Sequence, residues 1–142
     1  MSFSQSRGYF RSIANSMSLK EWRDGFNFDN IPANILDKSY HIESGSIVGV
    51  KLNQNDQEMN AQVNVRIFQK GFRDPASAID SVMQLSETFI KECLVPSNRL
   101  TQSYGVKNVV FENMLIEQIA ASNDNAVISN LQFRVLIILD LI

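Results

Sequence analysis

Few residues of this 142-residue chain have side chains suited to catalysis, and none of them belongs to a recognisable catalytic set. His41 is the only histidine and Cys93 the only cysteine. His41 falls in a predicted strand, and a histidine that acts as a general base needs a partner group to position it. Cys93 falls on the apolar side of a predicted helix, where a thiol is buried and inert. We therefore expect no catalytic residue and predict that the chain is not an enzyme.

Two short polar segments, 53–58 and 123–125, carry the oxygen ligands that calcium prefers. Neither has the glycine and the distal bidentate glutamate in EF-hand register, so both are interpreted as polar loop tips. A single cysteine excludes an internal disulfide, and the lack of a Cys/His cluster excludes a structural zinc site. No phosphate-binding GxxxxGK[ST] or GxGxxG motif occurs. The sequence thus predicts neither a metal nor a cofactor.

Composition indicates a globular chain and one α+β domain over residues 1–142. Hydrophobic residues make up 44% and charged residues 20%, whereas disordered chains have fewer apolar residues and a stronger net charge. Thirteen Lys and Arg against fifteen Asp and Glu give a net charge of −2, which argues against electrostatic binding of nucleic acid. The most apolar run, 135–139, is far shorter than the ~20 residues of a membrane helix. We expect no secretory leader and a cytoplasmic site of assembly.

The first half of the chain predicts a helix followed by a β-hairpin. Tyr9, Phe10, Ile13 and Met17 recur at helical spacing, which predicts an N-terminal helix over about 4–22. Apolar and polar residues alternate strictly over 58–68, as in a strand with one buried face. With a strand that starts near residue 40 and is interrupted near Gly45, this segment predicts an antiparallel hairpin over about 40–68. The polar loop 53–57 is interpreted as too long for a tight turn and as a protruding tip.

The second half predicts a helix followed by two strands. Asp74 and Pro75 supply an N-cap and a first helical residue, so a helix is expected over about 75–93. Its predicted buried side consists of Ile79, Val82, Met83, Phe89, Ile90, Cys93 and Leu94.

Strands are expected over about 106–142, with a bend near Glu112 and Asn113 in the first of them. The last strand is apolar on both faces at Leu136 and Ile138, which predicts cover on both sides, either within the sheet or from a neighbouring subunit. The element order predicts an α+β fold, with a mostly antiparallel twisted sheet of four to five strands and two main helices packed on it.

Three segments carry a resemblance to a known family. They are 30–43 (NIPANILDKSYHIE), 65–76 (VRIFQKGFRDPA) and the long final strand 131–142. Together with the element order over nearly the whole chain, they resemble the tail terminator, or tail completion, proteins of long-tailed bacteriophages. The resemblance implies a structural virion protein that forms a homo-oligomeric ring, usually a hexamer, at the head-proximal end of the tail tube. Such a ring joins the tube to the head connector, and DNA passes through its lumen without sequence-specific contacts.

The resemblance also implies partners: further copies of the chain, the tail tube protein and the head–tail connector protein, with no membrane. We expect three contact regions from loop position and charge. Their residues are Arg7 and Arg11 of the basic helix; Asn53, Gln54, Asn55, Asp56 and Gln57 of the loop toward an adjacent ring; and Lys70, Phe72, Arg73 and Asp74 at a subunit seam or a head-facing side. Two alternatives remain open, another neck or head-completion connector protein and a non-viral small α+β ligand-binding module.

Overall fold

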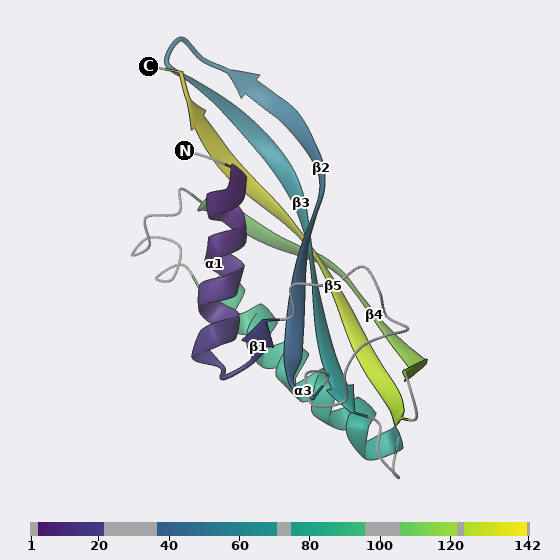
Figure 1. The fold of residues 1–142 in the computed structure, drawn as a ribbon. Helices are drawn as coiled ribbons and strands as arrows, with labels where there is room; N and C mark the ends of the chain where they lie inside the picture. Colours follow the sequence, from purple (N-terminus) through teal and green to yellow (C-terminus); the bar gives the residue numbers. More distant parts are fainter. Residues whose placement is uncertain (1–2, 22–36, 71–74, 96–105, 122–123, 142) are drawn as a thin grey trace.

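Two helices pack on one face of a five-stranded sheet (Figure 1). The computed structural model describes residues 3–21, 37–70, 75–95, 106–121 and 124–141. The helices are α1 (Phe3–Ser16) and α3 (Pro75–Leu94). The strands are β1 (Lys20–Glu21), β2 (Ser39–Leu52), β3 (Asp56–Lys70), β4 (Val106–Ala121) and β5 (Asp124–Asp140). The predicted α+β class is confirmed.

The sheet has the order β1-β2-β3-β5-β4. The pairs β2–β3, β3–β5 and β4–β5 are antiparallel, and the two-residue strand β1 runs parallel to β2. The sheet is therefore mixed, and the prediction of a mostly antiparallel sheet is right. Strand β3 pairs with β5 at every residue from Asp56 to Lys70 without a register shift, so these two strands form the centre of the sheet.

The core lies between this central pair and the two helices. The alternating residues of β3 predicted to face inward are buried, as are the corresponding residues of β5 from Leu131 to Ile137. The centroid of the Phe133 ring lies 5.0 Å from the ring centroid of Phe10 on α1 and 5.9 Å from that of Phe89 on α3. Because one side chain of β5 contacts an aromatic ring from each helix, both helices are held on the same sheet face.

Helix α1 ends at Ser16, six residues before the predicted end near residue 22. Ser18 has a φ of 64°, in the left-handed region. The amide of Leu19 donates to the carbonyl of Ala14 (3.1 Å), and the amide of Ser18 donates to that of Asn15 (3.0 Å). These two bonds are those of a Schellman motif, and Leu19 is buried after it. The prediction missed the end because serine, not the usual glycine, occupies the left-handed position.

The β2–β3 hairpin also differs from its prediction. Asp56 and Gln57 belong to β3, and the backbone amide of Asn53 donates to the carbonyl of Asp56 (2.8 Å), so the turn is short. Strand β2 is continuous through Gly45, where the register shifts between Ser44 and Ile47. The predicted interruption is therefore a β-bulge, which bends a strand without ending it.

The two C-terminal strands follow their prediction closely. The register of β4 against β5 shifts between Phe111 and Asn113, at the predicted bend. Strand β5 lies inside the sheet, with β3 along one edge and β4 along the other. On the sheet face away from the helices, its residues Leu136 and Ile138 are only half-buried.

Replacing Ser18 with glycine should stabilise the protein. Glycine adopts a positive φ without the cost that a side chain adds, so Ser18→Gly should raise the free energy of unfolding by roughly 0.5 kcal/mol. Urea unfolding followed by far-UV circular dichroism measures this change.

Ser12→Gly is the matched control, since Ser12 lies inside α1. Glycine there should lower the free energy of unfolding by about 0.5 kcal/mol. If both substitutions destabilise the protein, the capping role of Ser18 is wrong.

Candidate interaction surfaces

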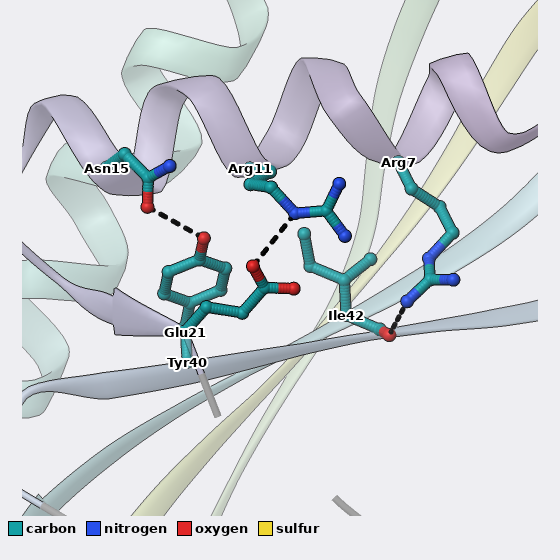
Figure 2. A network of polar contacts seen from close by, with 6 residues as sticks. All are labelled: Arg7, Arg11, Asn15, Glu21, Tyr40 and Ile42. Carbon is teal, nitrogen blue, oxygen red and sulfur yellow. Dashed lines mark hydrogen bonds and ion pairs between the residues drawn. The ribbon is translucent and has the colours of Figure 1, made fainter. Parts of the chain in front are cut away.

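Hydrogen bonds of polar side chains connect α1 to the start of β2 (Figure 2). Arg7 donates from Nη2 to the backbone carbonyl of Ile42 (3.0 Å), and the Tyr40 hydroxyl donates to Oδ1 of Asn15 (2.8 Å). Arg11 forms an ion pair with Glu21 of β1, with 2.9 Å between Nε and Oε2. The helix therefore contacts both β1 and β2 through hydrogen bonds as well as through its apolar side.

These contacts change how the predicted contact residues Arg7 and Arg11 are understood. Both side chains are half-buried and engaged inside the subunit. A guanidinium that already holds a carboxylate or carbonyl offers fewer donors to a neighbouring chain. Their role in contacts between subunits stays a prediction, and their structural role is to position α1.

The predicted loop region forms the tip of the hairpin. Asn53 Nδ2 donates to Oδ1 of Asp56 (2.9 Å), and the backbone amide of Leu141 donates to the carbonyl of Asn55 (2.9 Å). Figure 1 shows this tip and the end of β5 together, beyond the N-terminal end of α1. Gln54 is exposed and Gln57 is half-buried in β3. The tip thus projects from the molecule, and the hydrogen bond from Leu141 connects it to the C-terminal end of the described chain.

The second half of β2 is an exposed apolar strand that the sequence analysis did not identify. We call residues 44–52 the arm. All its side chains are exposed, and the large aliphatic ones are between 40% and 69% exposed: Ile47, Val48, Val50 and Leu52. The sequence did contain this aliphatic run, but a strand with apolar residues on both faces is usually covered, so exposure could not be expected from it.

A second apolar surface lies at the opposite edge of the sheet, between α3 and the edge strand β4. This α3–β4 groove has a volume of about 750 Å³. Its lining combines four apolar residues with charged residues that are mostly acidic and with two amides: Met83, Ile90, Phe111 and Met114; Asp80, Glu87, Lys91 and Glu112; Gln84 and Asn113. Met83 is 44% exposed and Leu94 is also exposed, so the prediction that both lie on the buried side of α3 is wrong. Both side chains lie on the flank of α3 that the sheet does not cover.

The sheet face away from the helices is rich in neutral amides. Asn60, Gln62 and Asn64 of β3 lie beside residues of β5 that include Asn130 and Gln132, and all are half-buried. Arg66 on the same face pairs with Glu43 (3.1 Å) and donates to Asn130 (3.0 Å). Amides both donate and accept hydrogen bonds, so this face can bind another polar protein surface with little dependence on charge.

The other predicted contact region falls largely outside the described residues. Lys70 is the last residue of β3 and lies in register with Ala126, whereas Phe72, Arg73 and Asp74 are not among the described residues. Asn123 of the second candidate calcium segment is likewise outside them. In the part of the chain that the structure describes, no group of three or more His, Cys, Asp or Glu side chains is placed to bind a metal.

The two candidate reactive residues are both buried. His41 lies on β2 opposite Arg66 of β3. Cys93 is fully buried in α3, and its backbone carbonyl accepts a hydrogen bond from the Tyr9 hydroxyl (2.7 Å). Burial, assisted by the neighbouring Glu92 carboxylate, raises the pKa of the Cys93 thiol well above its ordinary value. The predicted burial of Cys93 is confirmed, and its environment disfavours the nucleophilic thiolate.

None of the helices in the described part of the chain is long and apolar enough to cross a membrane. No protein-family model matches the sequence, and a search of curated proteins gave no match. The described surfaces, rather than a shared family, therefore carry the functional argument.

Cys93 should be protected from thiol reagents in the folded protein. Reaction requires local or global opening, so alkylation should be at least ~100-fold slower in buffer than in urea. Mass spectrometry of iodoacetamide-treated protein measures both rates. Equal rates in the two conditions would contradict the buried position of the thiol.

The same burial predicts a dependence of stability on pH. Because the folded pKa is raised, the unfolded chain releases the thiol proton first, and the free energy of unfolding should fall as pH rises above about 9.0. Cys93→Ala controls for other groups that titrate there, and the extra decrease should be absent from that variant.

Proposed function

We propose that the chain is a structural virion protein, a tail terminator that caps the phage tail tube at its head-proximal end and joins it to the head connector. One observation carries the proposal: a small subunit bears two apolar surfaces, the arm and the α3–β4 groove, on different sides of one sheet. Surfaces of this kind are unfavourable in water unless a partner covers them. In a ring, each neighbouring subunit can supply that cover.

The charge of the chain also supports this role. A ring through which DNA passes must not hold the duplex, and tight holding requires many contacts between phosphates and Lys or Arg. The net charge of −2 provides no such excess of positive charge. The amide-rich sheet face offers a neutral polar surface for stacking against another ring.

The sequence resemblance adds support from the order of elements. An N-terminal helix, a long hairpin, a second helix and two closing strands follow one another as in the tail terminator family. The segment 65–76 joins β3 to the start of α3, and the long final strand corresponds to β5. A neck or head-completion connector of similar size is the nearest alternative, and co-purification with tails rather than with filled heads separates the two.

A ligand-binding module is the second candidate, because the lining of the α3–β4 groove combines apolar side chains with polar and charged ones. For this function the groove would take a small amphipathic molecule and the chain would remain a monomer. The arm has no role in that account, and we therefore favour the ring.

Native mass spectrometry over a concentration series, with negative-stain imaging of the same sample, tests the proposed function. The expected result is a species of about six times 16.1 kDa that appears as a ring with a central hole. Added to growing tail tubes, this ring should stop their elongation. A chain that neither assembles nor binds the ends of tubes contradicts the proposal, and a monomer that binds small apolar ligands favours the module.

A further inference from the structure

We infer that the arm of one subunit docks in the α3–β4 groove of a second copy, so that the subunits join head to tail. This inference rests on the proposed ring and identifies the surfaces that close it.

The arm is suited to enter a groove. Strand β1 pairs with β2 only at Ser39 and Tyr40, and Arg7 donates to the carbonyl of Ile42. Beyond these contacts, no strand among the described residues lies along the outer edge of the arm. Its backbone groups can therefore pair with another strand. Val50 and Leu52 stand more than half exposed beside this edge and provide apolar side chains for a partner surface.

The groove is suited to receive a strand. Strand β4 is the last strand of the sheet, so no other strand of the described part of the chain lies along its outer edge. The groove runs beside this edge, with Phe111 and Met114 of β4 on one side and Met83 of α3 on the other. A strand added to β4 would place alternate side chains in the groove, which is the arrangement of β-augmentation.

Charge favours this pairing. The arm contains Lys51 and no acidic residue. Lys51 is the only charged residue of the arm, and Glu58, which lies in register with it, is itself paired with Lys107 (3.0 Å). The groove has three carboxylates and one lysine, and that lysine, Lys91, is paired with Glu87 (3.2 Å). The basic arm and the acidic groove are therefore complementary.

Symmetry then decides the type of assembly. The arm and the groove are different surfaces on different edges of one sheet, so a contact between them is heterologous. Such contacts repeat from subunit to subunit and form a ring when the rotation closes. An arm-to-arm dimer would leave both grooves uncovered, whereas head-to-tail docking covers every arm and every groove with one kind of contact.

Complementary loss-of-contact variants test the inference. Val50→Asp places a charge on the arm and Met83→Asp places one in the groove; both positions are well exposed, so the fold should persist. Thr88→Asp is the control, since Thr88 lies on α3, is exposed and does not line the groove. Circular dichroism verifies folding, and native mass spectrometry measures the assembly of each protein.

The wild-type chain and the Thr88→Asp control should assemble, and each arm or groove variant alone should be monomeric. A mixture of Val50→Asp and Met83→Asp retains one intact arm and one intact groove, so it should form a dimer of about twice 16.1 kDa and nothing larger. A mixture that stays monomeric, or rings that persist in either variant, would overturn the inference.

Zero-length cross-linking provides a second readout that does not depend on a stable dimer. A carbodiimide should join Lys51 of one subunit to Asp80, Glu87 or Glu112 of another, and a mixture of 15N-labelled and unlabelled chains identifies bonds between subunits. If assembled wild-type rings contain none of these cross-links between subunits, the docking mode is wrong, whereas the proposed function is not contradicted. A wild-type chain that never assembles, alone or on tail tubes, overturns both.

Discussion

The continuous pairing of β3 with β5 is the constraint on which the other features depend. These strands remain in register from Asp56 opposite Asp140 to Lys70 opposite Ala126. At ~3.3 Å a residue such a strand spans about 50 Å, whereas α1, with 14 residues, spans only about 21 Å. A sheet this long extends past its helices, and the hairpin tip projects beyond α1 (Figure 1).

The two apolar surfaces follow from this mismatch between sheet and helices. At one end, β2 leaves the cover of α1 after Ile42, and its side chains change from buried to exposed within a few residues. At the other edge, α3 lies over the sheet through Val82, Phe89 and Cys93, and Met83 on its exposed flank lines the groove together with β4. The helices thus leave both the arm and the groove uncovered, and in the proposed ring a second copy covers them.

The sequence predicted what depends on local pattern. The alternation of β3, the proline at the start of α3 and the bend of β4 at Glu112 could be read from neighbouring residues, because each arises from side-chain periodicity or backbone restriction. The end of α1 could not, since Ser18 adopts a conformation that usually signals glycine. The exposure of Val50 and Leu52 could not be predicted either. It depends on how far along β2 the N-terminal end of α1 reaches, which is a property of the tertiary structure.

Hydrogen exchange, measured on the dilute monomer and on the concentrated assembly, tests the central claim most directly. If the arm of one copy pairs with the edge of β4 in the next, backbone amides of residues 44–52 and of β4 should exchange more slowly in the assembly. Amides of β3 and β5 are already paired within the subunit and should change little. An assembly in which neither the arm nor β4 gains protection would contradict the account.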